Sequence, residues 1–462
     1  MTSEGLRQAT DKMHARGVDQ RAINVFEHYW HELREGAHGT IPEDTIEPLG
    51  DVPALDDFTP TDEERRAALA QTVVIKLNGG LGTSMGMTGP KSALEVRDGL
   101  TFLDLIARQV LALRREHGVD LPLILMDSFR TRDESLAILE RYPELAVEGL
   151  PLDFLQNAEP KLRADELTPV EWPADPSLEW CPPGHGDIYV ALQGTGLLAT
   201  LREKGIRYAF LSNADNLGAT CDPDIAAWMV AGRVPYAAEV CPRTANDRKG
   251  GHLARRRSDG RMILRDSAMV VDGEDHHFQD NERHRYFHTN NLWVDLEVLE
   301  RLLEERDGVL GLPIIINRKT VDPSDKTSPK VIQIESAMGT AVEAFEGSQA
   351  LLVPRARFRP VKTTSELLLL RSDVFEIDDD AVVHSVIDHP EPAIRLDEHY
   401  KLMPDFDARF ADGVPSMRQC TGFAVEGDVT FEGGVTCVGD VRVVADEAIT
   451  VPAGTILRGD DS

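Results

Sequence analysis

The stretch VVIKLNGGLGTSMGMTGPKS, residues 73–92, joins a short apolar run to a glycine-rich loop and then to a lysine. The β-branched run Val73 to Ile75 predicts a buried strand, and five glycines follow it at positions 79, 80, 82, 86 and 89. Because glycine has no side chain, backbone N–H groups in such a loop can approach an anion closely. Lys91 follows Pro90, which fixes the backbone and presents the cation at a set distance from the loop. The stretch therefore predicts phosphate binding.

Two common phosphate-binding motifs differ from this loop. A Walker A loop has glycine directly before its lysine, whereas Pro90 stands there in this chain. A Rossmann fingerprint reads G-x-G-x-x-G, and residues 80–86 place one residue too many before the last glycine. A flexible turn with an exposed lysine is the simple alternative, but five glycines in the eleven residues 79–89 are more than a turn needs.

The loop resembles the L-x-G-G-x-G-T…P-K pattern of sugar-nucleotide pyrophosphorylases, and the longer match LNGGLGTSMG…GPKS is similar to the eukaryotic-type UDP-glucose pyrophosphorylase (UTP–glucose-1-phosphate uridylyltransferase) family. Further segments match in family order: PPGHGDIY at 182–189, LSNADNLGAT at 211–220, RKGGHL at 248–253, HTNNLW at 288–293, IQIESAMG at 332–339 and FRPVKTTSELLLL at 358–370. Together the matches span roughly residues 70 to 375.

The pattern of strands and helices predicts an α/β fold. Residues 19–36 read as an amphipathic helix, and the capping pairs Thr61 with Glu64 and Thr101 with Asp104 predict two further helix starts. Strands are expected at 72–78, 121–126 and 208–215, and a strand, helix, strand order implies parallel pairing. The resemblance implies a mostly parallel, Rossmann-like nucleotidyltransferase sheet flanked by helices, with ligands at the carboxyl ends of the strands.

Three regions are expected along the chain: an N-terminal helical segment and linker at 1–65, a nucleotidyltransferase catalytic domain at 66–385, and a small C-terminal domain at 386–462. From about Met417 short β segments recur at near-hexapeptide spacing, with Val429, Val435 and Val441 six residues apart. This pattern resembles a short left-handed β-helix, and a plain antiparallel meander is the alternative. In the family such a domain often carries subunit contacts, which implies a homo-oligomer.

Composition limits the partners of the chain. Its 462 residues carry a net charge of −30, which argues against nucleic acid and requires any anion site to gather its own cations. Motif positions supply these at Lys76, Lys91, Arg248, Lys249 and Lys362. No run is long enough to span a membrane, no signal peptide is evident, and the five cysteines are scattered and odd in number. A cytoplasmic location is expected, with no membrane partner.

The resemblance implies attack of the glucose 1-phosphate oxygen on the α-phosphorus of UTP, which yields UDP-glucose and pyrophosphate. Such a transfer needs alignment and charge neutralisation rather than a covalent intermediate. The implied catalytic residues are Lys91, which would hold the UTP phosphates, and Lys362, which would stabilise the transition state. Asp215 is the expected ligand of Mg²⁺, the one cofactor implied.

The resemblance also implies two sets of binding residues. For UTP they are Leu77, Asn78, Gly79, Gly80, Lys91, Gln156 and Gly184. For the sugar phosphate they are His185, Asn213, Asp215, Asn290, Asn291 and Glu335. An amide such as Gln156 both donates and accepts, which suits the uracil edge, and amides and carboxylates discriminate patterns of sugar hydroxyls.

Departures from the family pattern bear on which sugar phosphate is the substrate. Ser84 stands where the N-acetylhexosamine branch carries arginine, so glucose 1-phosphate is the expected acceptor, while Cys181 replaces a usual aromatic residue and 322–330 forms an extra loop. A broad UDP-sugar pyrophosphorylase and a non-catalytic UTP-binding scaffold stay open as alternatives. A hexapeptide-type acyltransferase is disfavoured because about 40 residues of β-helix are too few to build an acyl-CoA groove.

Overall fold

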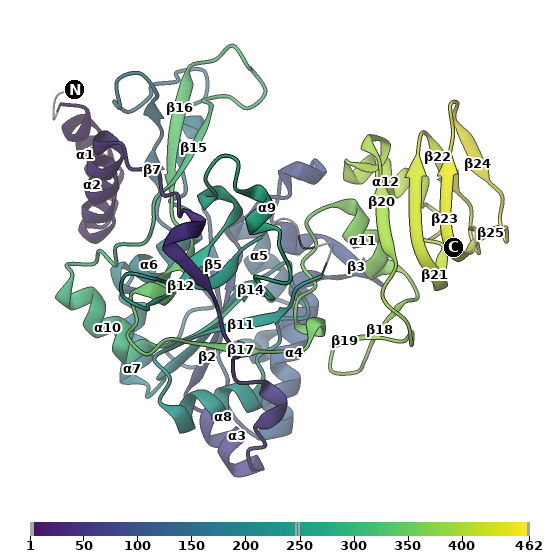
Figure 1. Ribbon diagram of the computed structural model, residues 1–462, viewed down its shortest axis with the longest axis horizontal. Coiled ribbons are helices and arrows are strands. Elements are labelled where there is room, and N and C mark those ends of the chain that lie inside the picture. Colours follow the sequence, from purple (N-terminus) through teal and green to yellow (C-terminus); the bar gives the residue numbers. More distant parts are fainter. Residues whose placement is uncertain (1–3, 245–246, 248–249, 460–462) are drawn as a thin grey trace.

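The computed structural model describes residues 4–244, 247 and 250–459, and it places a mixed α/β sheet at the centre of the molecule (Figure 1). In the described part of the chain this sheet has seven strands, in the order β17-β11-β14-β10-β2-β5-β6. Their bounds are β2 Thr72–Leu77, β5 Leu123–Asp127, β6 Asp153–Leu155, β10 Tyr208–Asn213, β11 Tyr236–Pro242, β14 Tyr286–Asp295 and β17 Gln349–Leu352. Only β14 runs antiparallel to its neighbours, so the expected mostly parallel sheet is confirmed.

Helices cover both faces of this sheet because its central strands are apolar on both sides. In β2, Val74 packs in one hydrophobic cluster, whereas Val73 and Ile75 pack in another on the opposite face. The first face is covered by α3 Asp62–Leu69, α4 Phe102–His117 and α8 Pro223–Gly232. The second face is covered by α6 Ile188–Gly194, α7 Leu197–Glu203 and α10 Leu296–Glu305.

The expected helix starts are confirmed. Thr61 and Thr101 each form a capping box, with Glu64 and Asp104 respectively. The N-terminal helices are α1 Glu4–Arg16 and α2 Gln20–Glu35, and α2 begins after Asp19 and ends at Gly36 in a left-handed cap. These two helices pack in a separate cluster against a small sheet of β15 Ile315–Thr320, β16 Lys330–Glu335 and β8 Leu162–Arg163.

Smaller elements surround the central sheet. They are β1 Ile46–Pro48 with β12 His252–Arg256 and β13 Met262–Arg265, β3 Glu95–Arg97 with β4 Leu100–Thr101, β7 Glu159–Pro160 with β9 Trp180–Cys181, β18 Phe375–Ile377 with β19 Val383–Ser385, and the helices α5 Arg132–Leu139 and α9 Asp275–Phe278. The helix α11 Thr364–Arg371 and then α12 Met403–Arg409 lead to the C-terminal unit (Figure 1).

The C-terminal unit consists of parallel strands, which overturns the antiparallel meander. One sheet has the order β20-β21-β23-β25, with bounds Ala393–Leu396, Ser416–Glu426, Thr436–Val444 and Ile456–Arg458, and β22 Val429–Phe431 pairs with β24 Ile449–Val451. Every one of these pairs is parallel. Val429, Val435 and Val441 are all buried, as their spacing predicted. They belong to the same cluster as the α4 face, so this unit packs on the rest of the molecule.

None of the helices in the described residues is long and apolar enough to cross a membrane.

Candidate active site

The glycine loop leaves the carboxyl end of β2, where the first five residues assigned to UTP lie. Asn78 is 3% exposed, and its amide donates to Asp127 Oδ1 and Ser135 Oγ at 2.7 Å each while its oxygen accepts from Ser92. The side chain of Asn78 therefore holds the loop in shape and leaves only backbone groups for a ligand. Burial raises the pKa of the supporting Asp127 carboxyl to about 6.

Gln156 and Gly79 lie against each other at this edge of the sheet. A Cβ added at Gly79 would lie 2.7 Å from Gln156 Nε2, so a side chain at residue 79 would displace the amide. Gly184 has φ of +82°, and an added Cβ would lie 2.5 Å from the carbonyl oxygen of Ser336. Gly79 thus leaves room for the Gln156 amide, and Gly184 lets the backbone of Ser336 approach closely.

Lys91, Lys362 and Asp215 converge although they come from three distant segments. Lys91 Nζ lies 2.9 Å and Lys362 Nζ 3.1 Å from the same oxygen, Asp215 Oδ2. Lys91 also donates to the carbonyl of Val361, the residue before Lys362. The other oxygen, Asp215 Oδ1, is buried and has no hydrogen-bond partner among the residues that the structure describes. The Lys362 side chain is 56% exposed, so the cation remains accessible to a phosphate.

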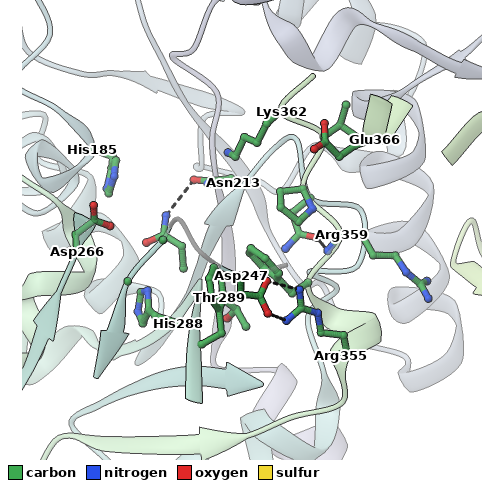
Figure 2. A pocket seen from close by; sticks show the side chains of 18 of the residues that line it. His185, Asn213, Asp247, Asp266, His288, Thr289, Arg355, Arg359, Lys362 and Glu366 are labelled. Atoms are coloured by element: carbon green, nitrogen blue, oxygen red, sulfur yellow. Dashed lines mark hydrogen bonds and ion pairs between the residues drawn. The ribbon is translucent and has the colours of Figure 1, made fainter. Parts of the chain in front are cut away.

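A cavity of about 700 Å³ adjoins these residues, and Figure 2 shows its walls. His185, Asn213, Asn290 and Lys362 line it. His185 Nδ1 accepts from the backbone N–H of Met338 at 2.9 Å, so in the neutral ring the proton lies on Nε2. Asn290 has φ of +61°, a conformation that asparagine tolerates better than most residues, and its amide lies 3.4 Å from Asn213 Oδ1.

Sequence reasoning missed several polar residues of this cavity, among them Asp266 and His288, which lie on the same side as His185 in Figure 2. His288 is 6% exposed, its Nε2 has no hydrogen-bond partner within the described part of the chain, and burial lowers its pKa to about 4. His288 opens the quoted motif HTNNLW, so a signal was present. Asp266 lies outside every quoted motif, and the sequence offered no signal for it.

The expectation that Lys76 supplies a cation to the site is wrong. Its side chain is 2% exposed and donates to Ser212 Oγ at 2.8 Å and to the carbonyl of Ala219 at 2.6 Å. Burial lowers the pKa of Lys76 to about 7. The physical reason is its place inside a sheet covered on both faces, where the side chain holds two neighbouring segments. Arg248 and Lys249 lie outside the described residues.

Asn291 and Glu335 are placed differently from the other residues assigned to the sugar. Asn291 is 1% exposed, and its amide donates to Glu239 Oε2 at 3.0 Å, so its side chain serves a buried network. Glu335 ends β16, and its Cβ lies 3.0 Å from the place that a Cβ at Gly184 would occupy, beside the loop that carries His185. A sugar contact at either residue stays a prediction.

The carboxylate oxygens of Asp215 suit a metal ion that takes few ligands from the protein. No group of three or more His, Cys, Asp or Glu side chains that could hold a metal occurs in the part of the chain that the structure describes. Mg²⁺ commonly binds through one or two carboxylates and takes its other ligands from phosphates and water. Oδ1 of Asp215, which is buried and accepts no hydrogen bond from any described residue, therefore fits Mg²⁺ bound together with a phosphate ligand.

A glycine loop, two converging lysines and one carboxylate at the carboxyl edge of a mostly parallel sheet define the class of α/β nucleotidyltransferases. The family model for UTP–glucose-1-phosphate uridylyltransferase matches residues 23–437. The chain is 39% identical to the Solanum tuberosum enzyme of that name, over 91% of this chain and 85% of the relative, and 36% identical to the Hordeum vulgare enzyme, over 99% and 96%.

Solved structures agree with this assignment. The UDP-glucose pyrophosphorylase from Leishmania major, solved in open and closed structures, is 41% identical, with a TM-score of 0.93 and coverage of 100% of this chain and 99% of that one. A UDP-glucose phosphorylase from Trypanosoma brucei is 42% identical, with a TM-score of 0.92 and 99% of both chains covered. The chain belongs to the UTP–glucose-1-phosphate uridylyltransferase family.

Proposed function

We propose that this protein transfers the uridylyl group of UTP to glucose 1-phosphate. A phosphate oxygen of the sugar ester attacks the α-phosphorus of UTP, the bond from that phosphorus to the β-phosphate oxygen breaks, and pyrophosphate leaves with the bonding electrons. The observation that carries the proposal is the meeting of Lys91 and Lys362 at Asp215 Oδ2, beside the cavity that His185 lines. Membership of the family supports the same reaction.

The two lysines have different roles in this proposal. Lys91 follows the glycine loop, and its side chain is 15% exposed, so it holds the UTP phosphates against this loop. Lys362 is the more exposed cation and lines the sugar-phosphate cavity, so it bridges the reacting phosphates. Fixed cations stabilise the charge that accumulates on the phosphate oxygens, and this needs no reorganisation during the reaction.

Mg²⁺ is the proposed cofactor, and Asp215 is the residue that would hold it. When bound, it would neutralise charge on the UTP phosphates. Two positive side chains already share Oδ2, and Oδ1, which has no hydrogen-bond partner among the described residues, is the proposed ligand atom.

The two substrates bind at two sides of the site, UTP near Gln156 and the sugar phosphate near His185. Gln156 reads the uracil edge, and Gly79 leaves room for its amide. The backbone at Gly184 is the other proposed contact of the nucleotide. On the sugar side, His185 donates from Nε2 to the phosphate, and Asn213 and Asn290 meet the hydroxyls. Asp266 and His288 complete this wall as hydroxyl partners.

The test is pyrophosphate release from UTP and Mg²⁺ with glucose 1-phosphate, with galactose 1-phosphate and N-acetylglucosamine 1-phosphate run in parallel. We expect a strong preference for the glucose ester. Comparable rates with several sugars would instead assign a broad UDP-sugar pyrophosphorylase. Absence of release with all three would overturn the proposal in favour of a scaffold that binds UTP.

The C-terminal unit is proposed to be a left-handed β-helix of the domain 386–462, following the catalytic domain 66–385 and the N-terminal segment 1–65. Its paired strands lie about one coil apart, as Val429 with Ile449 and Val438 with Arg458 illustrate. At its last coil Val444, Ile449 and Ile456 are 56, 43 and 56% exposed. Exposed aliphatic side chains at one end support contact with a second copy of this chain.

A cytoplasmic location is proposed on the state of the cysteines. All five lie among the described residues, and each is a free, buried thiol. Free thiols are typical of a reducing compartment. Fractionation of cells that express the protein would test this, and recovery outside the cytosolic fraction would contradict it.

A further inference from the structure

Asp215 and Lys362 lie 147 residues apart in the chain, yet their side chains meet at 3.1 Å. Asp215 belongs to the loop that follows β10, and Lys362 ends the segment 355–362 that precedes α11. The loop and the segment are attached to the sheet separately. The distance between the two side chains therefore depends on the contacts that join the loop to the segment.

Asn216, the residue after Asp215, joins them. Its amide nitrogen donates to the carbonyl of Arg357 at 3.1 Å and to Asn291 Oδ1 at 3.4 Å. Its amide oxygen accepts from the backbone N–H of Arg359 at 2.9 Å and from that of Gly218 at 3.2 Å. An amide has two donor hydrogens and two acceptor positions, so the whole capacity of Asn216 is used.

Because all its hydrogen-bonding positions are used, Asn216 differs from a residue that binds a ligand. It borders the cavity but is only 3% exposed, and it has no unused polar group to offer a substrate. Two of its bonds reach the segment of Lys362 and one returns to its own loop. Its bonds therefore serve the relative position of two loops.

Neighbouring contacts show that the joint is tight. Asn216 and Pro360 form an isolated antiparallel β-bridge, and the carbonyl of Asp215 accepts from the N–H of Val361 at 3.0 Å. A Cβ at Gly218 would lie 2.3 Å from the carbonyl oxygen of Ala356, so the loop packs directly on the segment. On the far side, the Arg357 guanidinium makes two hydrogen bonds to Glu239, at 2.7 and 2.6 Å, which anchors the segment to β11.

We infer that Asn216 is a positioning residue that sets the distance between Asp215 and Lys362 by joining the loop of one to the segment of the other. This inference rests on the proposed uridylyl transfer. Without the amide, the N–H of Arg359 loses its partner, and next to Asp215 the segment keeps only the backbone contacts of Pro360 and Val361, while the bonds of Arg357 to Thr220 and Asp222 hold a more distant part of the loop. Because misplacement of a catalytic group by about 1 Å can cost about 10²-fold in rate, the effect falls on turnover.

The experiment compares Asn216→Ala with a matched control, Gln109→Ala. Gln109 is also a buried amide, and its nitrogen donates to the carbonyl of Leu217 in the same loop and to that of Ala381, but it does not contact the segment of Lys362. Both variants are expected to lower the melting temperature by a few degrees. Only Asn216→Ala is expected to lower kcat, by about 10²-fold, while the Kd for UTP measured without sugar phosphate stays within about threefold. If Asn216→Ala does not fold, Asn216→Ser takes its place, since a hydroxyl and a water can occupy the vacated space.

A double variant provides the readout that a purely structural role would not move. In a Lys362→Ala background, Asn216→Ala is expected to lower kcat by less than about threefold, because the residue whose place it sets is already absent. An equal loss in both backgrounds, or a loss in Gln109→Ala as large as in Asn216→Ala, would overturn the inference. Failure of the proposed function is distinct, since the unaltered protein would then release no pyrophosphate.

Discussion

The ammonium of Lys362 lies 3.1 Å from Asp215 Oδ2, in a protein whose net charge is −30. A negative mean field opposes the approach of UTP and of a sugar phosphate. The group formed by Lys91, Lys362 and Asp215 offsets this locally, because two lysines share one carboxylate and the group retains a positive charge. The charge of this group therefore has the opposite sign to that of the whole chain.

Replacing Lys362 by alanine removes the exposed cation of the pair. We expect Lys362→Ala to lower kcat by about 10²-fold or more, while UTP still binds through Lys91 and the glycine loop. Steady-state kinetics and calorimetric titration with UTP measure the two effects separately. Lys204→Ala is the control, because that lysine is exposed after α7 on another part of the surface. Unchanged turnover in Lys362→Ala would remove this residue from the mechanism.

Replacing Asp215 by asparagine keeps the shape of the side chain and removes its charge. We expect Asp215→Asn to raise the Mg²⁺ concentration needed for half-maximal rate by about 10- to 100-fold, because the oxygen that binds the cation no longer carries a negative charge. The measurement is rate against Mg²⁺ concentration at saturating substrates. Asp120→Asn, at an exposed position after α4, is the control. A lower rate with unchanged Mg²⁺ dependence would restrict Asp215 to anchoring the two lysines.

A methyl group at Gly79 tests the nucleotide side of the site. Gly79→Ala places a Cβ 2.7 Å from Gln156 Nε2, so the amide must move away from the uracil position. We expect KM for UTP to rise by about tenfold with a smaller change for glucose 1-phosphate. Gly50→Ala is the matched control, since a Cβ there meets nothing within 4 Å and its φ is not positive. Equal KM values in the two variants would contradict the assignment of Gln156 to the base.

Acid should destabilise the protein through His288. Burial lowers the pKa of His288 to about 4, from the ordinary value of 6.5. Below pH 6.5 the unfolded chain therefore binds a proton at this residue that the folded protein does not, and stability falls as the pH drops towards 4. Between about pH 7 and pH 5 this one group should account for about 2 kcal/mol.

The measurement is urea unfolding of the unaltered protein and of His288→Asn at about pH 7 and pH 5. We expect the variant to lose about 2 kcal/mol less than the unaltered protein over this range. His117→Asn is the control for removal of a histidine, since that residue ends α4 and does not line the cavity. An identical loss in His288→Asn and the unaltered protein would show that the ring titrates normally in the folded state.

Local patterns were enough to predict much of the fold. The capping pairs at Thr61 and Thr101 and the stop at Gly36 were read correctly, because caps depend on neighbours three or four residues away. The parallel pairing of β2 with β5 followed from the intervening helix. The regular spacing predicted the burial of Val429, Val435 and Val441, but it left parallel and antiparallel pairing open, and the structure shows parallel strands.

The candidate site was predictable only in part. The motif residues Lys91, Asp215 and Lys362 were identified from sequence, and they do converge. The prediction that Lys76 supplies a cation to the site was wrong, because the sequence does not show whether the strand that carries this lysine is exposed or covered. Asp266 was missed, because its approach to His185 and His288 depends on how β13 and β14 pack.

The sequence by itself determined the glycine loop, the helix caps, the regular spacing of short strands in the C-terminal unit and the family of the protein, because each depends on residues close together along the chain or on their order. Only the tertiary structure decided that two lysines share one oxygen of Asp215, that Asn291 turns into a buried network, and that Asn216 joins two loops. These are contacts between residues that lie from 52 to 147 positions apart. Such contacts arise only when packing of the whole sheet brings its strand ends to a common edge.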